Sequence, residues 1–208
     1  MIRGIIFDFD GVIAESVQVK TDAFVELYKQ YGSNILEKVI KHHEGNGGMS
    51  RFEKIKFYHE SFLNKTITDG KISELANQFS GLVVEKVIAA PYVPGALEYI
   101  KKSYEKYKLF ISTGTPTTEI KHILEERGIA QYFTAVFGSP EEKNDHINHI
   151  ISTYGMRPNT LVFYGDSNVD HDAAENAQIP FVLIKNAFNK SLIGTYKGRV
   201  IDNFTKVQ

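Results

Sequence analysis

The second half of this 208-residue chain alternates short apolar runs with helical patterns, and this alternation constrains the fold more than any other feature. Strands that alternate with helices along a chain form a parallel sheet whose two faces are covered by helices. The pattern therefore predicts an α/β fold. In chain order, the expected elements are a helix at 94–100, a strand at 108–112, a helix at 117–127, a strand at 135–137, a helix at 141–154, a strand at 160–164, a helix at 173–177, and strands at 181–184 and 199–201.

The apolar run that begins at Ile5 predicts one more strand of the same sheet, although the next expected strand starts only at residue 108. The simplest arrangement is a core of residues 1–14 and 91–208, interrupted after its first strand by a helical insertion of residues 15–90. Within the insertion, helical spacing of apolar residues predicts helices near 17–28, 35–43, 51–62 and 72–88.

Composition excludes several classes of function. The formal net charge is −1, so the chain has no basic field that would attract nucleic acid or an anionic membrane. It has no cysteine, which excludes disulfides, thiol catalysis and thiolate metal sites. No apolar run is long enough to cross a bilayer, and the first residues do not read as a signal peptide. We expect a cytoplasmic protein without nucleic-acid or membrane partners.

Two carboxylates, Asp8 and Asp10, stand at the end of the first expected strand. Residues two apart in an extended backbone project to the same side, so both can serve one site at the carboxyl edge of the sheet. Two acids placed together are costly unless a cation or a reaction needs them. Both are candidate ligands of Mg²⁺, which prefers hard oxygen donors. Asp8 is also a candidate nucleophile, and Asp10 a candidate general acid and base.

Polar residues follow the later strands as well, and the ligand site of an open α/β sheet lies outside the carboxyl ends of its strands. After the strand at 108–112 come Thr113 and Gly114, whose hydroxyl and backbone N–H suit phosphoryl oxygens. After the strand at 135–137 the chain reaches Lys143, whose charge would offset that of a phosphate. In phosphoryl transfer the protein mostly positions the reactants and neutralises charge.

The loop after residue 164 carries two more carboxylates, Asp166 and Asp170, four residues apart behind a glycine. Together with Asp8 they form a candidate Mg²⁺ site. The expected catalytic group is therefore an acidic cluster, one lysine and one hydroxyl, gathered at one edge of the sheet.

Polar loops thus follow four of the expected strands. Taken in chain order, these loops resemble the motifs of the haloacid dehalogenase-like hydrolase superfamily, and the resemblance covers essentially the whole chain. Its Asp-x-Asp-Gly-(Val/Thr) motif matches residues 8–12, and its Gly-Asp-Ser-x-x-Asp motif matches residues 165–170. The hydroxyl that ends an apolar strand matches Thr113, or Ser112 one residue earlier, and the lysine that opens a helix matches Lys143. The resemblance implies a Rossmann-like core with a helical cap of the C1 type at residues 15–90.

The resemblance also narrows the chemistry. Dehalogenases of this superfamily lack the second aspartate because no leaving oxygen needs a proton, so Asp10 implies phosphoester chemistry. Residues 47–51 resemble a cap loop that faces the site in β-phosphoglucomutase-like and phosphoglycolate phosphatase-like members. Arg51 in this loop would then grip a substrate anion in a bidentate manner. Lys20 matches a polar position at the cap hinge and is expected to contact the substrate or Asp10.

Residues and resemblance together predict a Mg²⁺-dependent phosphatase that hydrolyses a small phosphorylated metabolite, such as a sugar phosphate or phosphoglycolate, through an aspartyl-phosphate on Asp8. A sugar phosphomutase that uses the same intermediate is the alternative. A catalytically inactive binding module on the same scaffold is a third possibility. The protein is expected to be a monomer or a homodimer. His42 and His43 are expected to lie on a solvated helix face.

Overall fold

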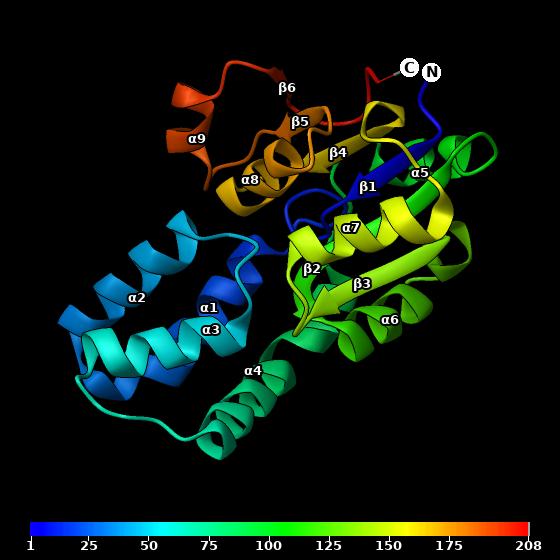
Figure 1. Cartoon of the computed structure of the whole chain (residues 1–208). Coiled ribbons are helices and arrows are strands. Elements are labelled where there is room, and N and C mark those ends of the chain that lie inside the picture. Colours follow the sequence, from blue (N-terminus) through cyan, green and yellow to red (C-terminus); the bar gives the residue numbers. More distant parts are fainter. Residues whose placement is uncertain (208) are drawn as a thin grey trace.

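The computed structural model describes residues 1–207, which form a six-stranded parallel sheet with helices on both faces (Figure 1). The strand order is β3-β2-β1-β4-β5-β6, and every neighbouring pair is parallel. The α/β class and all six expected strands are confirmed. The strands are β1 (Gly4–Phe7), β2 (Lys108–Pro116), β3 (Ala135–Ser139), β4 (Leu161–Gly165), β5 (Phe181–Ile184) and β6 (Arg199–Ile201).

Strand β1 lies in the middle of the sheet because its side chains are apolar on both faces. Ile5, Ile6 and Phe7 are all almost completely buried. Gly4 pairs with Lys108 of β2 on one side and with Leu161 of β4 on the other. Since all these strands run in the same direction, the loops after β1, β2 and β4 meet at one edge of the sheet.

Helices cover the two faces as the alternation of elements predicts. Ile5 and Phe7 share an apolar cluster with α5 (Ala96–Ser103) and α6 (Thr117–Glu126). Ile6, which points to the opposite face, packs with α7 (Lys143–Tyr154) and α8 (Asn168–Asn176). A short helix, α9 (Lys190–Thr195), follows β5.

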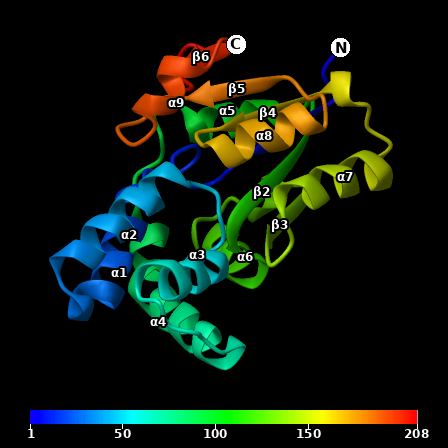
Figure 2. The ribbon, with the colours of Figure 1, turned by 60° about the vertical axis from the view of Figure 1, so that its left-hand side comes forward.

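The segment between β1 and β2 contains four further α-helices, which Figures 1 and 2 show grouped at the end of the sheet to which the strands point. In their shared core, the ring of Phe24 packs edge-to-face with Tyr58 and at a tilt against Phe79, and all three side chains are buried. The expected helices are therefore present, while the domain limits at residues 15 and 90 stay a prediction. The helices are α1 (Val17–Tyr28), α2 (Ser33–Gly45), α3 (Arg51–Phe57), which continues as a π-helical turn over Tyr58–Phe62, and α4 (Asp69–Ala89).

Some element boundaries differ from the expectation. Helix α8 starts at Asn168 rather than at residue 173, because Ser167 and Asp170 form a capping box that satisfies the first N–H groups of the helix. Strand β2 continues past residue 112 to Pro116, after a register shift against β3. Helix α9 was not expected. Within residues 1–207, none of the helices has the length and the apolar character that a membrane span requires.

Candidate active site

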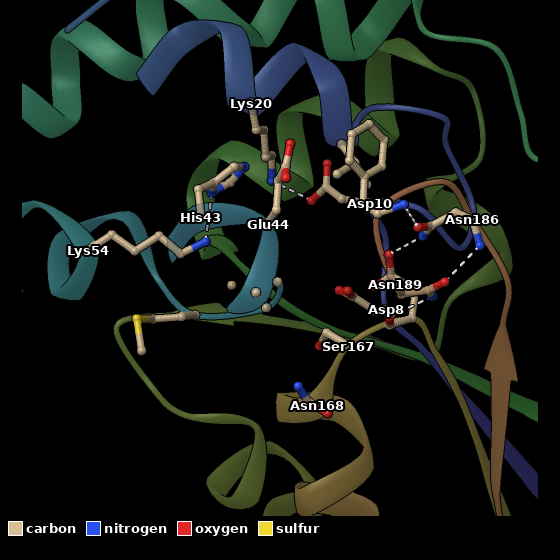
Figure 3. A pocket seen from close by; sticks show the side chains of 18 of the residues that line it. Asp8, Asp10, Lys20, His43, Glu44, Lys54, Ser167, Asn168, Asn186 and Asn189 are labelled. Atoms are coloured by element: carbon tan, nitrogen blue, oxygen red, sulfur yellow. Dashed lines mark hydrogen bonds and ion pairs between the residues drawn. The ribbon is translucent and has the colours of Figure 1, made fainter. Parts of the chain in front are cut away.

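A cavity of about 110 Å³ lies between the carboxyl edge of the sheet and the inserted helices (Figure 3). The loops after β1, β4 and β5 and the second half of β2 form one wall, and helices α1 to α4 with the turn between α2 and α3 form the other. Of the residues expected at the site, Asp8, Asp10, Lys20, Arg51, Thr113, Gly114 and Asp166 line this cavity.

Three buried aspartates form an acidic cluster in the sheet wall. One carboxylate oxygen from each of Asp8, Asp166 and Asp170 lies within 4.8 Å of the other two. Burial raises the pKa of Asp8 to about 7, since the opposing charge of Lys143 does not fully compensate. Burial, with the charges of Asp8 and Asp170, also holds the pKa of Asp166 well above its usual value. The cluster therefore holds more negative charge than the surrounding protein groups offset.

The donor set of this cluster fits a divalent cation of the Mg²⁺ type. All three ligands are hard carboxylate oxygens. Oδ1 of Asp8 is fully buried and accepts no hydrogen bond within residues 1–207, although the Lys143 ammonium lies 3.2 Å away. A buried anionic oxygen without a hydrogen bond is costly, and a cation would remove that cost.

Asp170 holds the surrounding loop in place and also contributes negative charge to the cluster. Its Oδ2 accepts hydrogen bonds from the backbone N–H groups of Asp166 and Ser167, at 3.2 and 3.0 Å, and from the Ser167 hydroxyl at 2.7 Å. Its Oδ1 pairs with the ammonium of Lys143, which opens helix α7. Burial disfavours the charged form of Lys143. The neighbouring carboxylates of Asp170 and Asp8 together have the larger effect and raise the pKa of Lys143, which stays cationic.

The side chain of Asp10 faces helix α1 rather than the acidic cluster. Its Oδ1 accepts a hydrogen bond of 2.6 Å from the Ser16 hydroxyl, and its Oδ2 pairs with the Lys20 ammonium. Lys20 also donates to Thr115 Oγ1 at 2.7 Å. Burial alone would raise the pKa of Asp10. The charge of Lys20 and the hydrogen bonds from Lys20 and Ser16 have the larger effect and hold this pKa below its usual value. Lys20 thus contacts Asp10, while a role of the Asp10 side chain as a metal ligand stays a prediction.

Two neighbouring hydroxyls of β2, on Ser112 and Thr113, have different surroundings. Ser112 is completely buried, and its hydroxyl shares a hydrogen bond of 2.9 Å with Nδ1 of His146. Thr113 and Gly114 line the cavity. A Cβ atom on Gly114 would lie 2.5 Å from the carbonyl oxygen of Gly48, so glycine is required where β2 meets the turn between α2 and α3. Geometry thus favours Thr113 as the hydroxyl that can meet a ligand.

Arg51 lines the cavity, but its guanidinium already forms an ion pair with a carboxylate of the protein. Its guanidinium forms a two-point ion pair with Glu119 of α6, with N···O distances of 2.8 and 2.5 Å, and donates to the Ser80 hydroxyl at 2.6 Å. It also lies over the ring of Phe79, 4.6 Å from the ring centre. The expected grip of Arg51 on a substrate anion stays a prediction.

Two asparagines after β5 belong to the site and were not expected. Asn186 donates to Asp166 Oδ2 at 2.6 Å, and Asn189 donates to the backbone oxygens of Asp166 and Ile184 at 2.8 and 2.7 Å. Both hold the loop that carries Asp166. Their position directly after an expected strand, at the same edge of the sheet, was the signal that could have identified them.

The expectation for His43 was wrong. The side chain is 6% exposed and lines the cavity, and its ring packs against Phe24 of α1, with 4.9 Å between the ring centres. Its Nδ1 lies 2.9 Å from the ammonium of Lys54, a buried lysine that the sequence did not mark as special.

The family model of the haloacid dehalogenase-like hydrolases matches residues 5–184. Phosphoglycolate phosphatase from Salmonella typhimurium is 26% identical over an alignment that covers 90% of this chain and 83% of that protein.

Two solved structures show the same fold. A predicted phosphoglycolate phosphatase from Haemophilus somnus 129pt has a TM-score of 0.76 at 22% identity and covers 98% of this chain and 95% of its own. The β-phosphoglucomutase from Clostridium difficile has a TM-score of 0.79 at 19% identity, with coverages of 100% and 94%. At these identities the two structures support the fold alone.

Proposed function

The chain belongs to the haloacid dehalogenase-like hydrolase family, and we propose that it is a Mg²⁺-dependent phosphatase that hydrolyses a small phosphorylated metabolite through an aspartyl-phosphate on Asp8. The relatives named phosphoglycolate phosphatase support phosphatase activity. The observation that carries the proposal is the buried cluster of Asp8, Asp166 and Asp170, which lies beside Lys143 and presents Asp8 and Asp166 to the cavity.

In the first step, Asp8 attacks the phosphorus atom and the ester oxygen leaves. Lys143, 3.2 Å from Asp8, orients this carboxylate and offsets the charge of the transferring phosphoryl group. The Thr113 hydroxyl and the backbone N–H of Gly114 hydrogen-bond phosphoryl oxygens. Asp8, Asp166 and Asp170 would hold the divalent cation, which supplies the positive charge that three buried carboxylates and a phosphate require together.

In the second step, Asp10 takes a proton from the water that attacks the aspartyl-phosphate. Its low pKa keeps it anionic in this conformation, which suits a base. To protonate the leaving oxygen in the first step, Asp10 must gain a proton, and this requires that Lys20 moves away from its carboxylate. Lys20 is therefore a positioning residue for Asp10.

The cavity itself supports a compact substrate. Its volume of about 110 Å³ is well below the roughly 300–1,000 Å³ of pockets for drug-sized ligands. Closure by the inserted helices would also exclude bulk water from the reacting groups.

The proposal is tested by phosphate release from a panel of phosphorylated metabolites, measured with Mg²⁺ and with EDTA. Metal-dependent release from a few compact compounds is the expected result. Isomerised sugar phosphate without phosphate release would instead identify a phosphomutase. Neither product from any compound, together with no turnover of p-nitrophenyl phosphate, would identify a binding module. The relatives named phosphatases favour hydrolysis.

Several finer expectations remain part of this proposal. They are Mg²⁺ rather than another divalent cation, a cytoplasmic location, a monomer or homodimer, no nucleic-acid partner, and a cap that comprises residues 15–90.

A further inference from the structure

A buried pair of basic side chains, Lys54 of α3 and His43 of α2, lies across the cavity from the acidic cluster (Figure 3). The two residues are 2% and 6% exposed, and both line the same cavity as Asp8. The turn at residues 46–49 connects α2 to α3 and brings Lys54 and His43 together. The pair therefore faces whatever part of a substrate points away from the reacting phosphoryl group.

The hydrogen bonds of this pair leave donors unused. An ammonium can only donate, so Nδ1 of His43 is the acceptor in the 2.9 Å contact with Lys54. The proton of a neutral His43 ring is then on Nε2, and this buried atom has no hydrogen-bond partner within residues 1–207. The Lys54 ammonium has three N–H groups and only this one acceptor in the same part of the chain. The pair therefore has N–H donors for which the described part of the surrounding protein provides no acceptors.

The charge of Lys54 is also unmatched, in contrast to the other basic residues of the site. Lys20 pairs with Asp10, Arg51 with Glu119, and Lys143 with Asp8 and Asp170. Between residues 1 and 207, no carboxylate lies within ion-pair distance, 4.0 Å, of the Lys54 ammonium.

The wider surroundings of Lys54 add little compensation. Its ammonium lies 5.8 Å from the centre of the Phe24 ring, a weak attraction. Burial lowers the pKa of Lys54 to about 7, and the charge of Lys20 on α1 adds to this effect. Asp10, Asp166 and Glu53 act in the opposite direction but do not compensate. A buried ammonium without a counterion is unfavourable, so the site is suited to an anion from outside the chain.

We propose that Lys54 and His43 bind a second anionic group of the substrate, a carboxylate or a second phosphate, while the first phosphoryl group reacts at Asp8. The substrates are then compact phosphomonoesters with two anionic groups. This inference rests on the proposed phosphatase function and names its substrate class. It also transfers the anion-binding role within the inserted helices from Arg51, which Glu119 neutralises, to Lys54.

Calorimetric titration with non-hydrolysable phosphonates tests this subsite without turnover. The probes are methylphosphonate, with one anionic group, phosphonoacetate, which adds a carboxylate, and ethylenediphosphonate, which adds a second phosphonate. Each is titrated, in a constant excess of Mg²⁺, into the wild type and into Lys54→Met. We expect Lys54→Met to weaken a two-anion probe by about 10- to 100-fold and methylphosphonate by less than about two-fold. The two-anion probe with the larger loss identifies the second group as carboxylate or phosphate.

Lys56→Met is the matched control, because Lys56 is exposed on the same helix and the chemical change is identical. Its affinities for all three probes should equal those of the wild type. The proposal is overturned if Lys54→Met weakens all three probes equally or none of them. It is also overturned if the wild type binds the two-anion probes no better than methylphosphonate. Failure of the phosphatase proposal is seen separately, as absence of p-nitrophenyl phosphate turnover by the wild type.

Discussion

Arg51 of α3 and Glu119 of α6 form a buried two-point ion pair that joins the inserted helices to the helices of the sheet. Ser80 of α4 donates to Glu119 at 2.6 Å and accepts from Arg51 at the same distance, so three helices meet at this contact. Burial opposes the charge of Glu119, yet Arg51 and Ser80 hold its pKa below the usual value. The contact therefore fixes the wall of the cavity that carries Lys54.

Glu119→Gln should destabilise the protein, because it leaves the Arg51 guanidinium buried without its counterion. We expect a loss of about 2–4 kcal/mol in the free energy of unfolding, measured by urea denaturation. Glu125→Gln, an identical change at an exposed position of α6, should cost less than about 0.5 kcal/mol. Equal losses in the two variants would show that the ion pair adds no stability.

Substitution of Thr113 should mainly reduce activity, and substitution of Ser112 should mainly reduce stability. Thr113→Val keeps the shape of the side chain and removes its hydroxyl from the cavity lining, so we expect kcat/KM to fall by about 10- to 100-fold. The variant also loses the 3.3 Å hydrogen bond that the hydroxyl accepts from the N–H of Thr115, which should cost about 1 kcal/mol of stability or less. Ser112→Ala breaks the buried hydrogen bond to His146 and should cost about 1–3 kcal/mol of stability with a smaller change in kcat/KM. The reverse pattern would make Ser112 the hydroxyl that meets the phosphate.

Lys54→Met should stabilise the ligand-free protein while it weakens binding. The pKa of Lys54 is about 7 in the folded state and 10.5 in its ordinary environment. As pH falls from 10.5 to 7, the unfolded chain takes up a proton that the folded chain does not, and the wild type loses stability relative to the variant. Below pH 7 the difference stays constant. We expect an advantage of about 1–4 kcal/mol for the variant near pH 7.

Urea denaturation of the wild type, Lys54→Met and Lys56→Met at several pH values between 7 and 10.5 measures this effect. The advantage of Lys54→Met should shrink as pH rises, and Lys56→Met should show none. An advantage that does not change with pH would mean that Lys54 is an ordinary cation in the folded protein.

Asp8→Asn should abolish turnover and raise the stability of the metal-free protein, because it removes one of three mutually repelling buried carboxylates. In EDTA we expect an unfolding temperature a few degrees above that of the wild type. Added Mg²⁺ should stabilise the wild type and have little effect on the variant. Asp22→Asn, at an exposed position of α1, is the control and should match the wild type in both conditions. A wild type that Mg²⁺ does not stabilise would contradict the metal site.

The central sheet could be predicted because its strands are short, apolar and separated by helical patterns. The same reasoning brought Asp8, Thr113 and Asp166 to one edge of the sheet, although Thr113 lies within β2 and not in the loop expected after residue 112. The start of α8 was missed because a local capping box, not apolar periodicity, determines it. Asn186 and Asn189 were missed because the reasoning was confined to charged and hydroxyl residues.

The second wall of the cavity could not be predicted from periodicity. Whether Arg51 or Lys54 has a free charge depends on Glu119, which lies 68 positions along the chain from Arg51 and on a different layer of the fold. His43 is buried because it packs against Phe24 of α1 and lies beside Lys54 of α3. Such pairings follow from tertiary packing, and no local pattern in the sequence predicts them.

Trapping of the phosphorylated protein tests the central claim most directly. Asp10→Asn should slow hydrolysis of the intermediate, because the base that activates water is removed. After reaction of this variant with p-nitrophenyl phosphate and Mg²⁺, acid quenching and peptide mass spectrometry should find one phosphoryl group, on Asp8. Turnover without phosphorylation of Asp8, or a phosphoryl group on another residue, would contradict the account.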